Sequence, residues 1–197
     1  MRNMQRAVGL LVAALILASG AEAFAFLGFG GSENWKEEVQ LSDGLVIVVE
    51  RETLRERGGD EWVMNRSGTK PKEYLIRFAH PDRQEEMIEW RSTKSYRTWP
   101  EVPLVLDLSE SRQPVVYTSV GINAGCEVYS KYVYSNGVWR EEMLPETFEK
   151  RITNLYLRIG VNMPWHVDLE TKRKGNAEIG YPTCYRQVGP TRKVCGD

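Results

Sequence analysis

Histidine and cysteine, which metal and acid–base sites use most, are scarce in this chain of 197 residues. The two histidines, His80 and His166, lie far apart, and neither has cysteine or carboxylate partners at the spacing of a metal site. We therefore expect both to be turn or surface residues. The sequence also lacks a Gly-x-Ser-x-Gly elbow, a glycine-rich phosphate loop and a His-Glu-x-x-His helix. These absences predict no metal, no cofactor and no catalytic residue, and they favour a protein that is not an enzyme.

An excess of charge of one sign is also missing, since 26 basic residues face 27 acidic ones and the net charge is −1. A nearly neutral, evenly mixed surface creates no field that would attract nucleic acid or an anionic membrane. Charged residues are interspersed with aromatic and β-branched ones, which excludes an intrinsically disordered protein. The length suits one folded domain, and no internal repeat is evident.

The one long hydrophobic run lies at the N-terminus, where Arg2 and Arg6 precede the apolar residues 7–18. Small residues follow, and Ala21-Glu22-Ala23 matches the small-x-small pattern of a cleavage site. This order of a charged, an apolar and a small-residue region is typical of a secretory signal peptide. It predicts a periplasmic or secreted protein.

The expected organisation is a signal peptide at residues 1–23, a flexible lead at 24–34 and a single β-rich domain at 35–197. Apolar residues resume after Glu22, so residues 7–31 are also long enough for an uncleaved membrane anchor, which needs about 20 residues. The cleaved form is favoured because the apolar core of the segment is short.

Three cysteines, an odd number, predict one disulfide and one free thiol in an oxidising compartment. Of the three possible pairings we favour Cys126–Cys195. It closes a long loop, which in the chain-entropy model contributes on the order of 4 kcal/mol, and it would anchor a polar C-terminus. The short-loop pair Cys184–Cys195 stays open. A nucleophilic role for Cys126 is not favoured, because the sequence places no base beside it.

Short runs of alternating apolar and polar residues, separated by turn dipeptides, predict a series of hairpins. Residues 35–41 alternate, Asp43-Gly44 supplies a type I′ turn, and residues 45–49 return as an apolar strand central in its sheet. Asn136-Gly137 is an equally strong turn signal. Further strands are expected at 74–78, 87–91, 104–108, 115–120, 127–134 and 138–143. Eight strands at this spacing predict a mainly β fold, an antiparallel sandwich or barrel.

Two stretches depart from the hairpin pattern. Residues 54–72 are charged and contain glycine, so a long loop is expected there. The C-terminal third is expected to be mixed and partly helical, because helical spacing over 148–159 after Pro145 competes with a strand at 154–159. A short helix is also expected at 168–174, with a polar face that carries Glu170, Lys172 and Arg173.

The long loop carries dense charge of both signs around one aromatic residue, Trp62. That composition is typical of an interaction surface with an aromatic anchor and a polar rim. Trp62 and Trp99 lie in polar surroundings and are expected to be exposed, whereas Trp35, Trp90 and Trp139 lie on strand faces and are expected in the core. We predict a partner-binding surface that consists of Arg57, Trp62, Arg66 and Trp99.

Two carboxylates, Asp107 and Glu127, provide an alternative function as the acid and base of an envelope glycan hydrolase. Asp107 interrupts the apolar strand at 104–108, where an inward charge would need a partner. The simpler interpretation is that Asp107 points outward or caps a turn.

Five sequence strings support a resemblance: WKEEVQLSDG at 35–44, ERGGDEW at 56–62, NRSGTKPKEY at 65–74, GCEVYSKYVY at 125–134 and ETKRKGN at 170–176. On these strings the chain resembles a group of exported proteobacterial proteins of unassigned function. The resemblance implies export and one continuous domain, and it carries no activity. It also implies a helix before the last cysteine, which Pro182 would interrupt here.

The expected function is therefore that of a non-enzymatic periplasmic interaction protein. It would bind another protein or an envelope component through the surface around Trp62. Besides the glycan hydrolase, a structural envelope protein held by an uncleaved N-terminus remains an alternative.

Overall fold

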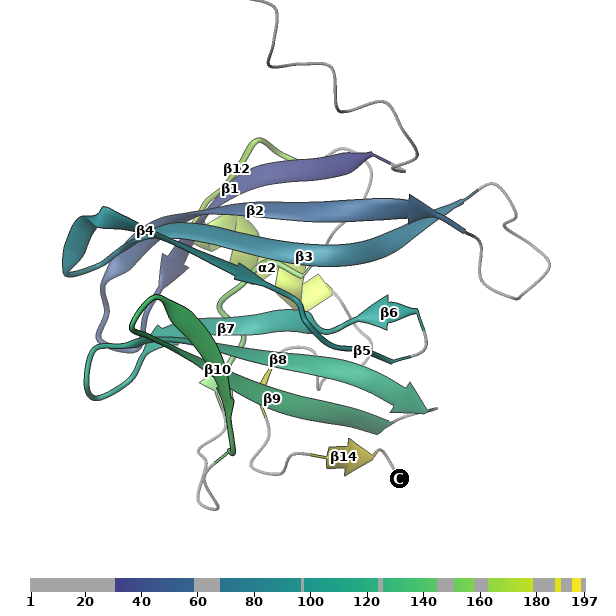
Figure 1. Ribbon diagram of the computed structural model, residues 1–197. Helices are drawn as coiled ribbons and strands as arrows, with labels where there is room; N and C mark the ends of the chain where they lie inside the picture. The colour runs from purple at the N-terminus through teal and green to yellow at the C-terminus, as the bar shows by residue number, and fades with distance from the viewer. Residues whose placement is uncertain are drawn as a thin grey trace, which may run out of the picture.

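The fold is mainly β, as expected, with several antiparallel sheets and one C-terminal helix (Figure 1). It is taken from a computed structural model. The structure describes residues 31–58, 68–96, 98–123, 126–144, 151–157, 163–178, 187–188 and 193–195. No helix in these ranges is long and apolar enough to cross a membrane.

The first large sheet has the strand order β12-β1-β2-β3-β4. Its four long strands form successive antiparallel hairpins. The short strand β12 pairs in parallel with β1 at the edge of the sheet. Their bounds are Ser32–Gln40 for β1, Val46–Arg57 for β2, Thr69–His80 for β3, Arg83–Arg91 for β4 and His166–Val167 for β12.

The second large sheet has the order β10-β9-β8-β7, and β14 pairs with the other end of β9. These strands are β7 at Val102–Leu108, β8 at Pro114–Asn123, β9 at Cys126–Ser135, β10 at Val138–Glu142 and β14 at Lys193–Cys195. The remaining elements are the strand pair β5 (Ser95–Tyr96) and β6 (Trp99–Pro100), the strand pair β11 (Arg151–Ile152) and β13 (Gln187–Val188), and the helix α2 (Leu169–Glu178).

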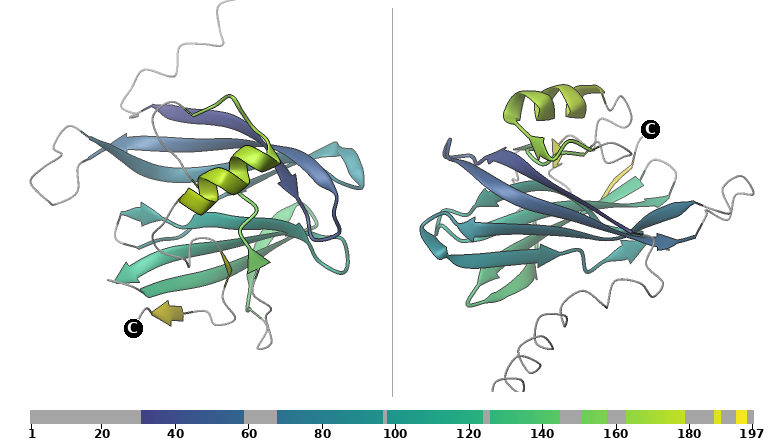
Figure 2. Two further views of the ribbon diagram at one scale, coloured as in Figure 1. Left: turned by 180° about the vertical axis from the view of Figure 1, so that it is seen from behind. Right: turned by 90° about the horizontal axis from the view of Figure 1, so that it is seen from above.

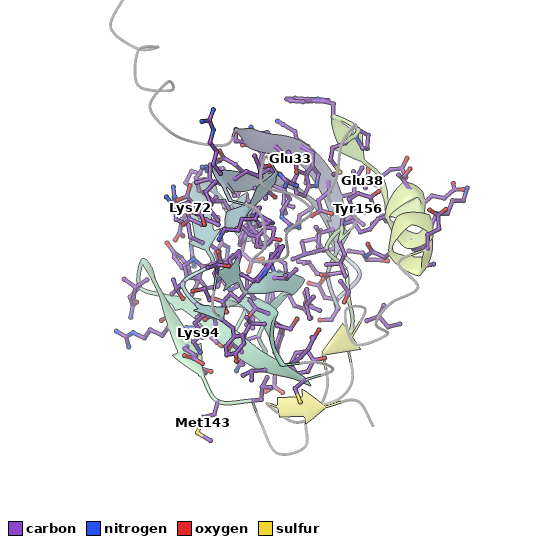
Figure 3. The ribbon with its side chains drawn as sticks, turned by 90° about the vertical axis from the view of Figure 1, so that its right-hand side faces the viewer. Glu33, Glu38, Lys72, Lys94, Met143 and Tyr156 are labelled. Atoms are coloured by element: carbon purple, nitrogen blue, oxygen red, sulfur yellow. The ribbon has the colours of Figure 1, made fainter. Side chains whose placement is uncertain are left out.

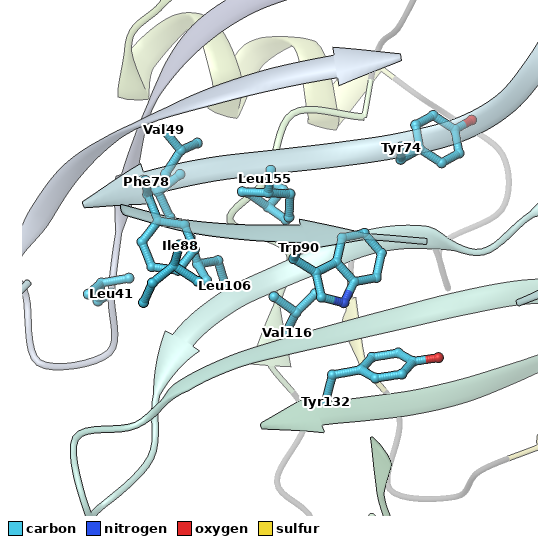
Figure 4. Close-up of a cluster of buried hydrophobic side chains, with 12 residues drawn as sticks. Leu41, Val49, Tyr74, Phe78, Ile88, Trp90, Leu106, Val116, Tyr132 and Leu155 are labelled. Atoms are coloured by element: carbon cyan, nitrogen blue, oxygen red, sulfur yellow. The ribbon is translucent and has the colours of Figure 1, made fainter. Parts of the chain in front are cut away.

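The core lies where the two large sheets face each other, so the described strands form a sandwich and no closed barrel (Figures 1 and 4). Every second residue of the first sheet points inward, and Ile76, Phe78 and Trp90 meet Val116 and Tyr132 of the second. The rings of Trp90 and Tyr132 have centroids 5.9 Å apart. A second cluster covers the other face of the second sheet, which explains why β7 and β8 have few polar positions.

The two turn predictions have different outcomes. Asn136 (φ 52°) and Gly137 (φ 81°) both have positive φ, as a type I′ turn requires. In the first hairpin only Gly44 (φ 87°) does. There the N–H of Leu41 donates to the carbonyl of Leu45 at 2.8 Å, so the type I′ prediction is wrong and the loop has three residues, with glycine at the left-handed position.

Two other expectations need correction. The ladder of β2 and β3 continues from Leu54↔Glu73 to Arg57↔Thr69, so the ends of the expected loop at 54–72 are strand, and residues 59–67 lie outside the described part. Over Arg151–Leu157 the structure has β11 and then irregular backbone, so the helix expected across 148–159 is wrong there, and so is the alternative strand at 154–159 over its described residues, 154–157. The helix expected at 168–174 is confirmed as α2.

Candidate functional site

The predicted partner-binding surface is described only in part. Arg57 is the exposed last residue of β2, and Trp99 begins β6 with 43% of its surface exposed. The β5–β6 pair packs on β3 and β8, and Figure 1 shows β6 at the same end of the molecule as the end of β2. Trp62 and Arg66 lie outside the described residues. The structure therefore places two of the four predicted residues at one end of the sandwich.

Of the three tryptophans predicted in the core, two are there and the third, Trp139, lies at its margin. Trp35 and Trp90 are buried in the core. Trp139 is partly buried: its Nε1 donates to the carbonyl of Glu89 at 2.7 Å, which ties β10 to the edge of β4. Trp165, just before β12, is 72% exposed and is therefore not a core residue.

Asp107 caps a turn, as the simpler interpretation had it, although it is buried and does not point outward. Its Oδ1 accepts hydrogen bonds from Ser42 N at 3.0 Å, Ser42 Oγ at 2.9 Å and Leu108 N at 2.9 Å. These bonds fix the β1–β2 turn against β7. The carboxylate therefore stabilises the contact between the two sheets at this turn.

The strand register separates Asp107 from Glu127. Asp107 pairs with Val115, which pairs with Val133 of β9, whereas Glu127 pairs with Gly121. Val133 and Glu127 are six residues apart on one strand, or about 20 Å at roughly 3.3 Å per residue. The carboxylates of glycosidases lie within about 10 Å of each other. The geometry therefore gives no support to a hydrolase that uses this pair.

A buried carboxylate that sequence analysis missed, Glu37 of β1, lies between two cations and is 0% exposed. Its Oε1 accepts Arg51 Nη1 at 2.5 Å, and its Oε2 lies 2.9 Å from Lys172 Nζ and accepts Tyr156 N at 2.8 Å. The guanidinium of Arg51 also stacks 5.2 Å from the ring of Trp35. The alternation of β1 places Glu37 on the inward face with Trp35, so its burial had a signal in the sequence.

Lys172 attaches α2 to the sheets and is only 4% exposed, so its placement on a solvated polar face is wrong. Its Nζ donates to the carbonyls of Glu38 and Asn154, in addition to its ion pair with Glu37. Burial lowers the pKa of Lys172, and the carboxylate of Glu37 opposes that shift. Figure 3 shows Glu38 and Tyr156 between the first sheet and α2.

Two further contacts hold α2. Asp168 caps its N-terminus by accepting Thr171 N at 2.7 Å. Asn176 accepts Leu157 N at 3.0 Å and donates to the carbonyl of Leu155 at 2.8 Å. The helix is thus held mainly by polar side chains, and it lies beside the open edge between the two sheets (Figure 2).

A groove with a volume of about 860 Å³ separates α2 from the end of β1 and from β7. Residues 152–154, at the end of β11 and just after it, form a further part of the wall, and the apolar lining includes Leu41, Val105, Ile152 and Leu169. Its polar lining includes Asp107, Asn154, Lys172, Arg173 and Asn176. The volume is in the range of pockets that take small organic ligands.

A further buried carboxylate, Glu101, lies in the crossing from β4 to β7. It accepts Thr93 N at 2.9 Å, Lys94 N at 3.1 Å, Thr118 Oγ1 at 2.7 Å and Tyr132 OH at 2.9 Å. Burial raises the pKa of Tyr132, so its hydroxyl remains a donor. Glu101 is not among the residues predicted from the sequence, although it is the one charged residue between Thr98 and Leu106.

The histidines take no part in these groups. His80 is buried, which corrects its expected surface position, but it lies at a turn as predicted and accepts Asp82 N at 3.1 Å. His166 is exposed, with its Nε2 3.7 Å from Glu38. Within the described ranges no three side chains of the metal-binding types lie together. Comparison with protein-family models, curated proteins and solved structures gives no match.

Proposed function

We propose that the protein is a non-enzymatic binding protein of the periplasm. Its partner would be another protein or an envelope component, and the contact would involve Arg57, Trp62, Arg66 and Trp99. The observation that carries the proposal is the 43% exposure of Trp99 on a short hairpin at the same end as Arg57. Tryptophan and arginine contribute more binding free energy to interfaces than most residues do.

Three buried carboxylates are occupied by structural hydrogen bonds, which supports a binding function over an enzymatic one. Glu37, Glu101 and Asp107 each accept several hydrogen bonds that hold strands, turns or the helix in place. A general acid or base needs a carboxyl group that can reach a substrate. These three side chains are instead part of the framework.

The test is recovery of a partner from an envelope fraction by the tagged full chain after chemical crosslinking. We expect the double variant Arg57→Ala with Trp99→Ala to lose most of the recovered partner. Trp165→Ala is the control, because it removes another exposed tryptophan, at the β12 edge. Equal recovery by the double variant and the control would contradict the proposal.

Export is a separate part of the proposal. We expect the mature chain to begin after Ala23, as measured by mass spectrometry of the N-terminal peptide from a periplasmic extract. A full-length chain that sediments with membranes would instead support the anchored structural protein.

We also propose the disulfide Cys126–Cys195. Its support is the pairing of β14 with β9, in which Cys195 stands directly opposite Cys126. Peptide mapping without reductant should recover the two cysteines in one linked peptide, and Cys184→Ser should leave that peptide unchanged. A peptide that links Cys184 to either of them would overturn the pairing.

A further inference from the structure

The groove beside α2 is built from parts that are distant in sequence, and the surrounding hydrogen bonds hold its shape. Asn154 Oδ1 accepts Leu106 N at 2.9 Å, and its Nδ2 donates to the carbonyls of Leu106 and Gln40 at 2.7 and 2.9 Å. Together with Lys172 and Asn176, it joins α2, β1 and β7. A groove that is already formed before a ligand enters loses less entropy on binding.

Most of the polar groups in the wall are already occupied. The amides of Asn154 and Asn176 donate to backbone carbonyls, and Lys172 Nζ contacts Glu37 and two carbonyls. The carboxylate of Asp107 faces three donors. These groups shape the wall and would add little to the binding of a charged ligand.

Arg173 is different, because it lines the groove and is exposed. Among the described residues it forms no ion pair. The next residue, Lys174, pairs with Glu170 at 2.7 Å and lies outside the groove lining. Among the described residues that line the groove, Arg173 is therefore the one accessible cation, and it lies beside an apolar wall. A guanidinium binds a carboxylate through two parallel hydrogen bonds.

One apolar side chain of the wall, that of Ile152, is also accessible, whereas Leu169 is half-buried and Leu41 is buried. Ile152 is 83% exposed and lines the groove together with Leu169 and Leu41. An isoleucine this exposed next to a groove is available for contact with an apolar ligand, which would remove its side chain from water.

We propose that this groove binds an amphiphilic anion, an alkyl chain that ends in a carboxylate. The carboxylate would pair with Arg173, and the chain would lie against Leu41, Ile152 and Leu169. This site is separate from the surface around Trp99, and it does not depend on a protein partner. A cationic amphiphile would meet Arg173 as a like charge, so the site discriminates by sign.

The test uses dodecanoate as the probe and measures its binding to the full mature chain by calorimetry. Dodecyltrimethylammonium and a neutral dodecyl glycoside have the same chain with other headgroups. We expect dodecanoate to bind, and Arg173→Gln to weaken it about ten-fold, in line with the loss of one charged hydrogen-bonded contact. Lys174→Gln is the matched control and should leave the affinity unchanged.

A second pair of variants tests the apolar contact. Ile152→Ser should weaken dodecanoate several-fold, whereas Met143→Ser, at a methionine that is 85% exposed and outside the groove lining, should have no effect. Both positions are exposed, so both variants should fold. The proposal is overturned if dodecanoate does not bind, if the three headgroups bind equally, or if Arg173→Gln and Lys174→Gln have the same affinity.

Discussion

Two of the buried glutamates, Glu37 and Glu101, stabilise the sandwich in different ways. Glu37 faces two cations, Arg51 and Lys172, whereas the hydrogen-bond donors to Glu101 are backbone N–H groups and hydroxyls. Each carboxylate joins elements that are distant in sequence. The difference lies in the charge of the partners. Glu37 compensates the positive charge of two buried side chains, whereas the groups that donate hydrogen bonds to Glu101 are neutral.

This difference determines what removal of the charge would do. Without the charge of Glu37, two buried cations would lose their partner, and an uncompensated buried charge is among the most costly defects in a protein. Without the charge of Glu101, the donors that remain are neutral and could bond to water or to an amide oxygen. The same chemical substitution should therefore have unequal consequences at the two sites.

The largest effect is expected for Glu37→Gln. It keeps the shape of the side chain but leaves Arg51 and Lys172 without a counter-charge, so we expect a loss of about 3–5 kcal/mol in the free energy of unfolding. Urea denaturation at neutral pH measures it. The triple variant Glu37→Leu, Arg51→Met, Lys172→Met should recover most of that loss, because it removes the carboxylate and both cations together and leaves no buried charge unpaired in the cluster. A triple variant as unstable as Glu37→Gln would show that packing, not charge, dominates this cluster.

A smaller effect is expected for Glu101→Gln. One oxygen acceptor remains for the hydroxyls of Thr118 and Tyr132, but the new amide group faces the backbone N–H groups of the crossing segment. We expect a loss of about 1–3 kcal/mol, measured in the same urea series. Losses of equal size for the two Glu→Gln variants would contradict the distinction between charged and neutral partners.

Features that depend on neighbouring residues could be predicted from the sequence, whereas contacts such as those of Glu37 could not. The hairpins follow from local signals, since the alternation of residues 35–41 and the Asn136-Gly137 dipeptide each involve neighbouring residues only. The contact between Glu37 and Lys172 depends on where the C-terminal segment returns to β1. A lysine within a polar helix gives no local indication that it will be buried.

The candidate sites show the same difference between local signals, which the sequence contains, and contacts between distant segments, which it does not reveal. The polar surroundings of Trp99 sufficed to predict its exposure, and the strand faces of Trp35 and Trp90 their burial. The groove could not be predicted, because its wall combines the end of β1, β7, α2 and residues 152–154. Such a site exists only after the sheets and the helix have been placed in three dimensions.

The next effect in size concerns Gly175, at which α2 packs against Tyr156. A Cβ atom there would lie 2.5 Å from Tyr156 Cε2, and Tyr156 is buried. We expect Gly175→Ala to cost about 1–2 kcal/mol through this overlap, despite the higher helix propensity of alanine. Hydrogen exchange should show faster exchange of the α2 amides. Combination with Tyr156→Leu, which removes the clashing ring edge, should restore protection of α2. Failure of that rescue would place the cause outside this contact.

The smallest effect is expected where carboxylates and their cation are exposed, at the turns that Arg112 joins. Its Nη2 and Nε contact Asp82 at 2.6 and 2.9 Å, and its Nη1 contacts Asp43 at 2.7 Å. Arg112 is the main cause that lowers the pKa of Asp82 below its ordinary value of 3.8. Between the folded and unfolded pKa values the unfolded chain binds more protons, so stability rises with pH.

The contribution of Asp82 is therefore fully present above pH 3.8 and is lost as the pH falls through the folded pKa. Arg112→Gln should flatten the dependence of the unfolding free energy on pH in this acid range and change it little at pH 7, because exposed ion pairs contribute little. Arg140→Gln is the matched control, since this exposed arginine has no ion pair among the described residues. Equal acid dependence in both variants would show that Asp82 gains nothing from Arg112.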